Sequence, residues 1–169
     1  MVISMALRTI RQIGDPILEK KAKDVTQMTD KIRNLIEDML DTMYEANGVG
    51  LAAPQVGMLK RICVIDISEE RNEPHVFINP RIVEKTGEQT GMEGCLSVPG
   101  KQGQVTRPQY VKVMAYDEEL KPFEFEGTDL MARAICHEFD HLDGHLYVEL
   151  AEDGLVDVEP YDGEEDEED

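Results

Sequence analysis

The sequence predicts an α+β fold, with mostly antiparallel sheets packed around a helix near the C-terminus and a long helix near the N-terminus. Two observations carry this prediction. Apolar residues recur at helical spacing in only two long stretches, while much of the chain between them shows the apolar character or alternation of strands. Helices and strands also do not take turns along the chain, as they would in a parallel α/β fold.

The chain of 169 residues is long enough for one compact domain and short for two. We expect a single domain over residues 1–150 and an acidic, partly disordered tail over residues 151–169. The formal net charge is −19, and residues 149–169 contain 12 acidic side chains and no basic one. The rest of the chain is only mildly acidic, so the sequence shows no basic footprint for direct binding of nucleic acid.

Three cysteines, an odd number, are too few for a disulfide scaffold. This number favours the reducing environment of the cytoplasm. The apolar start of the chain is too short and too interrupted for a signal peptide, and no stretch approaches the length of a membrane span. We therefore expect a cytoplasmic protein that does not bind membranes.

The first predicted element is a helix over about residues 26–46. Apolar residues recur there at helical spacing, opposite a charged face. Asp24, Thr26 and Thr29 are alternative N-caps, and the Asn-Gly pair ending at Gly48 is typical of a helix end.

The middle of the chain predicts strands. Residues 48–57 fit neither a helix nor a strand, but their small side chains permit close approach of a ligand or another backbone. Residues 61–67 form a nearly continuous apolar run, which predicts a strand buried on both faces. Two short strands are expected at 76–78 and 81–84, and alternation over 110–126 predicts a hairpin.

A glycine-rich and proline-rich turn is expected at 93–100, between these strands. The second helix is predicted over about 129–143, where a Gly-Thr-Asp sequence precedes the apolar periodicity. Short strands over 145–150 and 155–158 complete the expected fold.

The second helix contains the chemistry. His137 and His141 are four residues apart, so a helix places both imidazoles on one face, within reach of one metal ion. Glu138 is placed to contact a water molecule on that ion. The two histidines could instead be ordinary polar residues on a half-buried helix. They share their face with Leu130 and Ala134, however, which favours packed surroundings over open solvent.

A hydrolytic metal site needs a third protein ligand and an open position for water. Glu149 and Glu152 follow the helix, but no second apolar helix holds either of them in place. Cysteine is the better candidate. Cys63 lies in an apolar run and Cys136 points elsewhere on the helix, whereas Cys95 lies in a glycine-flanked turn.

Three stretches together resemble the peptide deformylase family. They are a G-φ-G-φ-A-A-P-Q loop at 48–55, an E-G-C-φ-S turn at 93–97 and an H-E-φ-x-H helix at 137–141, where φ is apolar. All three occur in the family's order and with similar spacing, and the resemblance covers about residues 5–150. It implies a single peptide deformylase catalytic domain over 1–150, built around a central metal-binding helix.

The resemblance also implies the reaction, which is metal-dependent removal of formate from N-formylmethionyl peptides of newly made proteins. It implies that Cys95, His137 and His141 bind the metal, with water as the fourth ligand. Glu138 is then the general base that takes a proton from this water and later passes one to the leaving amine.

Two oxyanion donors follow from the same resemblance, namely the side chain of Gln55 and the backbone N–H of Leu96. Small residues in the first loop suit a peptide lying beside it as an added strand. The resemblance and the helix periodicity together assign the substrate-binding residues Val49, Gly50, Gly94, Leu130 and Ala134.

The family resemblance implies ferrous iron in the cell, with Ni²⁺, Co²⁺ or Zn²⁺ able to occupy the site. A set of one cysteine, two histidines and one water also suits zinc by geometry, and ligand softness alone does not decide between these ions.

Two features depart from some family members. Those members carry a basic C-terminal helix that is associated with ribosome docking, whereas residues 149–169 are acidic here. We therefore do not expect ribosome association to use such a helix. Residues 5–8 resemble a common family start, so residues 1–4 are interpreted as an upstream extension and either Met1 or Met5 as the start.

The second departure is Arg133, which shares the face of the two histidines. We include it among the substrate-binding residues, where it could bind a peptide carbonyl or carboxylate. Equally, its stem could pack while its head reaches water. We also expect an ion pair between Glu93 and Arg107 that orients the turn around Cys95.

Two other functions fit parts of the pattern. A zinc endopeptidase would use the same helix, would cleave internal peptide bonds and would tolerate loss of Cys95. A non-catalytic peptide-binding domain would use the metal structurally. A structural site normally closes its fourth position with a protein ligand, which argues against this last alternative.

Overall fold

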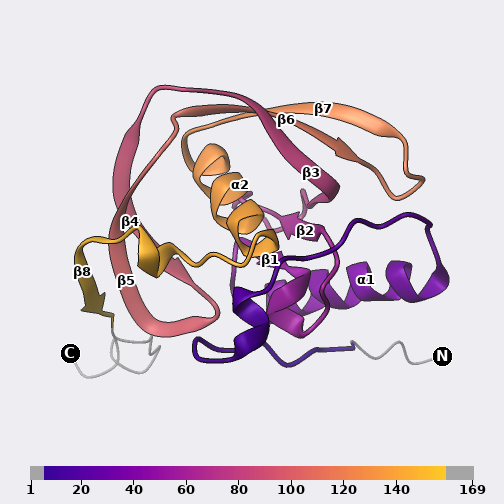
Figure 1. Cartoon of the computed structure of the whole chain (residues 1–169), viewed down its shortest axis with the longest axis horizontal. Coiled ribbons are helices and arrows are strands. Elements are labelled where there is room, and N and C mark those ends of the chain that lie inside the picture. The colour runs from indigo at the N-terminus through magenta and orange to yellow at the C-terminus, as the bar shows by residue number, and fades with distance from the viewer. Residues whose placement is uncertain (1–5, 159–169) are drawn as a thin grey trace.

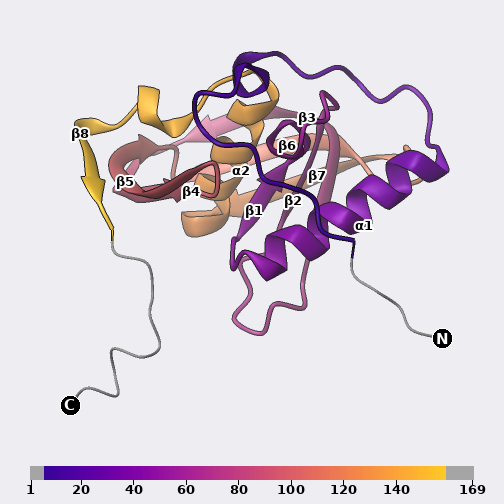
Figure 2. The same ribbon diagram turned by 90° about the horizontal axis from the view of Figure 1, so that it is seen from below.

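The computed structural model describes residues 6–158 (Figures 1 and 2). The expectations for the upstream extension and for the acidic segment beyond residue 158 lie outside this range. The described elements are η1 (Pro16–Glu19), α1 (Asp30–Glu45), β1 (Gly50–Ala52), η2 (Ala53–Val56), β2 (Ile62–Ile65), β3 (His75–Thr86), β4 (Gln89–Cys95), β5 (Val98–Arg107), β6 (Tyr110–Tyr116), β7 (Pro122–Thr128), α2 (Asp129–Leu142), η3 (Tyr147–Glu149) and β8 (Glu152–Asp157).

The strands form two antiparallel sheets, which confirms the predicted α+β class. The larger sheet has the strand order β1-β2-β3-β6-β7, and the smaller has the order β4-β5-β8. The predicted short strands at 76–78 and 81–84 are one continuous strand, β3. A register shift follows Ile78, and Asn79 adopts a φ of 49°, so the irregular backbone hides the continuity from the sequence pattern.

The two helices pack on opposite faces of the larger sheet, as alternation along β2 shows. Ile62 and Val64 pack in the cluster that contains α1, whereas Cys63 and Ile65 pack in the cluster that contains α2. Successive strand side chains point to opposite faces. The nearly unbroken apolar run of this strand therefore reflects burial on both faces, as predicted.

Helix α1 begins at Asp30, four residues later than expected. Thr29 is its N-cap, and the Thr29 hydroxyl accepts a hydrogen bond from the N–H of Ile32 at 3.2 Å. Of the three alternative caps, the one nearest the apolar stripe is used.

Helix α2 lies between the two sheets (Figure 1). Eleven of its residues are buried, including Arg133, His137 and Glu138. This helix is buried on nearly every face. Its buried polar side chains therefore need specific hydrogen-bond partners. No helix among residues 6–158 is long and apolar enough to cross a membrane.

Of three predictions for the strands, one is wrong, one is incomplete and one is confirmed. Residues 145–150, predicted to form a strand, contain the 3₁₀ helix η3 instead, whose Tyr147 is buried. The predicted turn at 93–100 is the tip of a long hairpin formed by β4 and β5, whose glycines conceal the strand alternation. The strand predicted near 155–158 is present as β8, which pairs with β5 although all six of its residues are exposed.

The end of α2 provides a test of this packing. Gly144 has a φ of +83°, and a Cβ there would lie 2.6 Å from the carbonyl oxygen of Glu19. We expect Gly144→Ala to lower the free energy of unfolding by about 3 kcal/mol, because backbone strain adds to displacement of the neighbouring chain. Urea denaturation measures this change.

Gly154→Ala is the matched control. Gly154 has a similar φ of +78°, but nothing lies within 4 Å of an added Cβ. Only the conformational cost of about 1 kcal/mol should remain. Equal losses in the two variants would show that contact with residue 19 contributes nothing.

Candidate metal centre and cleft

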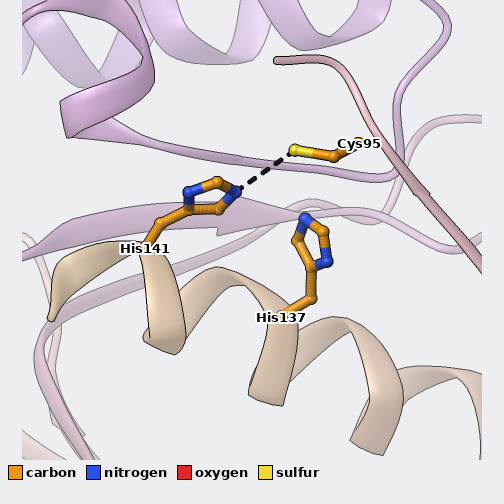
Figure 3. Close-up of side chains that lie close together, drawn as sticks. All are labelled: Cys95, His137 and His141. Atoms are coloured by element: carbon orange, nitrogen blue, oxygen red, sulfur yellow. Dashed lines mark hydrogen bonds between the residues drawn. The ribbon is translucent and has the colours of Figure 1, made fainter. Parts of the chain in front are cut away.

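Three side chains from two elements converge beside α2 (Figure 3). His137 and His141 project from one face of the helix, with ring centroids 5.0 Å apart. Cys95 ends strand β4, and its Sγ lies 3.3 Å from Nε2 of His141. One ligand atom from each of the three residues lies within 4.8 Å of the others.

Glu93 orients the first histidine. Its Oε2 lies 2.7 Å from Nδ1 of His137, and both side chains are buried. A carboxylate at this distance holds the proton on Nδ1 and leaves the Nε2 lone pair free for a metal. Burial alone would raise the pKa of Glu93, but hydrogen bonds from His137 and Arg107 lower it to about 2.

Two arginines hold this carboxylate in place. Arg107 donates to Glu93 through Nε at 3.1 Å and Nη2 at 2.6 Å, which confirms the expected ion pair. Its Nη1 also donates to Asp140 at 2.7 Å. The bidentate contact with Glu93 joins β5 to β4. The contact with Asp140 joins β5 to α2.

Arg133 is the second arginine, and the expectation that its head group reaches water is wrong. Its Nη1 donates to Glu93 at 2.9 Å and its Nη2 to the carbonyl of Val105 at 3.1 Å. The residue is only 8% exposed. The guanidinium therefore does not reach water, because acceptors on β4 and β5 bind its two terminal nitrogens, while the residue still lines the cleft described below.

The donor set suits a divalent transition metal. Thiolate sulfur and imidazole nitrogen bind such ions at about 2.0–2.3 Å, and three donor atoms within 4.8 Å of one another are close enough to share one ion. Among residues 6–158 no other group of three possible ligands was found. The site is held by β4 and α2, so its geometry depends on how these two elements pack.

The other candidate ligands lie elsewhere. Cys63 is fully buried in the core, and Cys136 is buried in the same cluster. Burial raises the pKa of Cys136 to about 11. Glu149 lies against exposed His145, and Glu152 accepts a hydrogen bond from Thr106. None of these four residues belongs to the group formed by Cys95, His137 and His141.

Glu138 lies beside the three possible ligands. Its Oε2 is 3.9 Å from Nε2 of His137, and its Oε1 is buried with no hydrogen-bond partner among residues 6–158. Burial is the main cause that raises its pKa, to about 7. Gly50 faces this carboxylate, since a Cβ at Gly50 would lie 2.5 Å from Oε2.

Gln55 is held in one orientation by η2. Its Oε1 accepts a hydrogen bond from the N–H of Ala52 at 2.9 Å, which identifies the other amide atom as the nitrogen. The Nε2 donates to Ser97 Oγ at 3.0 Å and lies 3.6 Å from Cys95 Sγ. The contact with sulfur is also a hydrogen bond, so both hydrogens of this amide point at the Cys95 turn.

A cleft of about 840 Å³ opens above these groups. It brings together most of the residues predicted from the sequence, which come from three separate parts of the chain; His141 lies beneath it. The predicted residues that line it are Val49, Gly50, Gln55, Gly94, Cys95, Leu96, Leu130, Arg133, Ala134, His137 and Glu138.

Sequence reasoning missed several residues at the rim of the cleft. Met92, Lys101 and Gln102 line it from strands β4 and β5. These residues are close to Cys95 in the sequence, so recognising a β4–β5 hairpin would have predicted that they lie near it. Val158 also lines the cleft, but nothing local indicates this, because the contact depends on pairing of β8 with β5.

Comparison with known proteins places these features in one family. The sequence model described as Polypeptide deformylase matches residues 7–154. The chain is 63% identical over 163 residues to the peptide deformylase of Lachnoclostridium phytofermentans, covering 96% of this chain and all of that protein. It is 66% identical to the one from Agathobacter rectalis, covering 91% and 96% of the two chains.

A solved structure shows the same architecture. The crystal structure of a peptide deformylase from Legionella pneumophila superposes with a TM-score of 0.85 at 46% identity. The match covers 88% of each chain. At 46% identity, the two proteins are similar in sequence as well as in fold.

The buried network predicts the effect of Glu93→Gln. Loss of the carboxylate charge leaves two buried arginines without their shared partner, so we expect the free energy of unfolding to fall by about 3 kcal/mol. The acceptor that orients His137 also loses its charge, and affinity for Ni²⁺ or Zn²⁺ should fall roughly 10–100-fold. Urea denaturation and metal titration measure the two effects.

Glu124→Gln serves as the control. Glu124 is 59% exposed and pairs with Lys112 at 3.6 Å, so its neutralisation should change stability by less than about 1 kcal/mol. Wild-type metal affinity in Glu93→Gln would contradict the orienting role of the carboxylate.

Proposed function

The chain belongs to the polypeptide deformylase family, and on this basis we propose that Cys95, His137 and His141 hold its catalytic metal. Members of the family are metal-dependent hydrolases that remove the N-formyl group from nascent peptides, and this is the reaction of the chain. The family relationship decides against the endopeptidase and the purely structural metal. The observation that best supports the proposed ligands is their convergence beside Glu138 at the floor of the cleft.

The metal, when bound, lowers the pKa of water toward neutrality and polarises the formyl carbonyl. We propose ferrous iron as the native ion, with Ni²⁺, Co²⁺ or Zn²⁺ as substitutes. The mixed sulfur and nitrogen donor set is compatible with all four. Helix α2 supplies two of the three proposed ligands, which makes it the metal-binding helix.

Glu138 is the proposed general base and acid. Hydrolysis of a formamide requires a proton to leave the attacking water and a proton to reach the departing amine. A carboxyl with a pKa of about 7 can do both near neutral pH. Its Oε1 has no partner within residues 6–158, so this oxygen is available for the transfer.

The oxyanion is assigned to two donors on different segments. Gln55 Nε2 donates to Ser97 and Cys95 in this structure and would turn one hydrogen to the oxyanion, and Leu96, which follows Cys95, offers its backbone N–H. Each well-placed donor stabilises a developing oxyanion by about 3–4 kcal/mol. The hydrogen bond from Ala52 to Gln55 Oε1 supports this assignment, because it fixes the amide before substrate binds.

The substrate peptide is proposed to lie between two sheet edges. Strand β1 ends the larger sheet and β4 ends the smaller, so each has an unpaired edge. Gly50 on β1 and Gly94 on β4 both line the cleft and would pair with the peptide backbone. Val49, Leu130, Ala134 and the stem of Arg133 would enclose the methionine side chain.

The cellular setting is also a proposal. The cytoplasm is where ribosomes make formylated chains, and three free cysteines suit its reducing conditions. We propose that residues 1–150 form the catalytic domain. Any association with the ribosome should not use residues 149–169, because their 12 acidic side chains repel the phosphates of RNA.

Formate release from formyl-Met-Ala-Ser tests the assignment. We expect anaerobically purified protein to release formate, and Glu138→Ala to be at least about 100-fold slower with its metal retained. Cys95→Ser should lose the metal itself. Glu37→Ala, on the exposed face of α1, should match the wild type. Retained activity in Glu138→Ala would exclude it as the base.

Oxygen sensitivity tests the proposed iron. Ferrous iron is readily oxidised by oxygen, whereas Ni²⁺ is not, and oxidation at the iron can carry over to the Cys95 thiolate, so the iron-loaded protein should lose formate release in air. A nickel-loaded sample should keep its activity under the same exposure. Metal analysis accompanies each measurement, and an iron-loaded protein that stays fully active in air would contradict the proposal.

A further inference from the structure

On the open edge of β1, the backbone groups of Gly50 have no partner on a neighbouring strand. Gly50 pairs with Ile65, and the N–H of Asp66 donates to the carbonyl of Val49 at 2.8 Å. This pattern places Gly50 at a position that makes no ladder hydrogen bonds with β2. Its N–H and C=O therefore point away from the sheet, at the edge that lines the cleft.

The neighbouring edge groups on both sides are already occupied. The N–H of Ala52 donates to Gln55 Oε1 at 2.9 Å. The carbonyl of Gly48 accepts a hydrogen bond from Nη2 of Arg71. An incoming strand consequently finds a free donor and acceptor at Gly50, with side chains of the protein capping the edge before and after it.

Arg71 comes from the loop that follows β2 and is held by more than this one contact. Its guanidinium lies 5.1 Å from the ring centroid of Tyr44, over the face of that ring. Its Nη1 also lies 3.4 Å from the carbonyl oxygen of Asp66. The backbone of Arg71 has a φ of 59°, a conformation that non-glycine residues adopt only when the surroundings require it.

Asp66 provides the base of this arrangement. Its side chain is fully buried and accepts hydrogen bonds from the Tyr44 hydroxyl at 2.7 Å, from the N–H of Ser68 at 2.8 Å and from the N–H of Glu73 at 3.0 Å. The carboxylate thereby folds the loop back on itself and connects it to α1. These hydrogen bonds of Asp66 hold the loop in the conformation in which Arg71 contacts the carbonyl of Gly48.

We propose that Arg71 is a positioning residue for the peptide substrate. By holding the Gly48 carbonyl it fixes the open edge of β1 and removes the next acceptor along that edge. A peptide then has one register in which to pair, at Gly50. This inference rests on the proposed function of the cleft, and it assigns Arg71 no contact with the reacting atoms.

Positioning of this kind acts on substrate binding more than on chemistry. Arg71 is not among the residues that line the cleft, and its contacts are with Gly48, Asp66 and Tyr44. Loss of the cap should therefore weaken ground-state and transition-state binding alike, which raises KM and leaves kcat unchanged. A general loss of folding would instead lower activity and metal content together.

The kinetic test uses Arg71→Met, which keeps most of the side-chain volume without its donors. We expect KM for formyl-Met-Ala-Ser to rise roughly tenfold, with kcat within about twofold of the wild type and the metal content unchanged. Arg71→Lys, which retains a charged donor, should recover part of this loss. Arg81→Met, at an exposed arginine on β3, is the matched control and should be unaffected.

Arg71→Gln provides a milder second variant, because it stays polar but is too short to span the same distance. It should show the same rise in KM. An unchanged KM in folded Arg71→Met and Arg71→Gln would overturn the proposal. A parallel fall in kcat and metal content would also overturn it, since that result would assign Arg71 a purely structural role.

Amide hydrogen exchange gives a readout that does not depend on activity. In Arg71→Met the amides of Leu51 and Asp66 should exchange roughly tenfold faster, while that of Ile135 in α2 should not change. Unchanged exchange at Leu51 and Asp66 would overturn the proposal that Arg71 fixes the edge of β1. Absence of formate release by the wild type would sink the proposed function, whereas the exchange result would still decide whether Arg71 holds β1.

Discussion

The buried carboxylate of Glu93 is the interaction on which the rest of the site depends. It accepts hydrogen bonds from Arg107, Arg133 and His137, and all four side chains are buried. Removing such charges from water costs several kcal/mol per ion, so the arrangement is stable only when every partner is present. The same contacts join β4, β5 and α2, which makes the orientation of His137 inseparable from the packing of the fold.

The cleft follows from where this packing leaves sheet edges open. The larger sheet ends at β1 and the smaller sheet at β4, and residues of both strands line one cleft together with residues of α2. Unpaired strand edges usually invite unwanted pairing. Here Gln55 caps one side of the edge of β1 and Arg71 the other, and Gly50 between them lines the cleft.

Sequence reasoning predicted the elements with strong local periodicity. Both helices were placed within a few residues, because apolar spacing and caps are local properties. The long hairpin of β4 and β5 was reduced to a turn, since its glycines interrupt the alternation that indicates strands. Residues 145–150 were expected to form a strand, but buried Tyr147 anchors a 3₁₀ helix there.

The sequence by itself determined the chemistry available to this protein. The four-residue spacing of His137 and His141 places them on one helix face, and resemblance to a family supplied Cys95 as their partner. Only the tertiary structure decided how the surrounding charges are used. Arg133 lies on a helix face that suits a ligand, yet its head group is held by Glu93 and Val105, which are distant in sequence. A local pattern gives the direction of a side chain, whereas its partner depends on which segments the fold brings together.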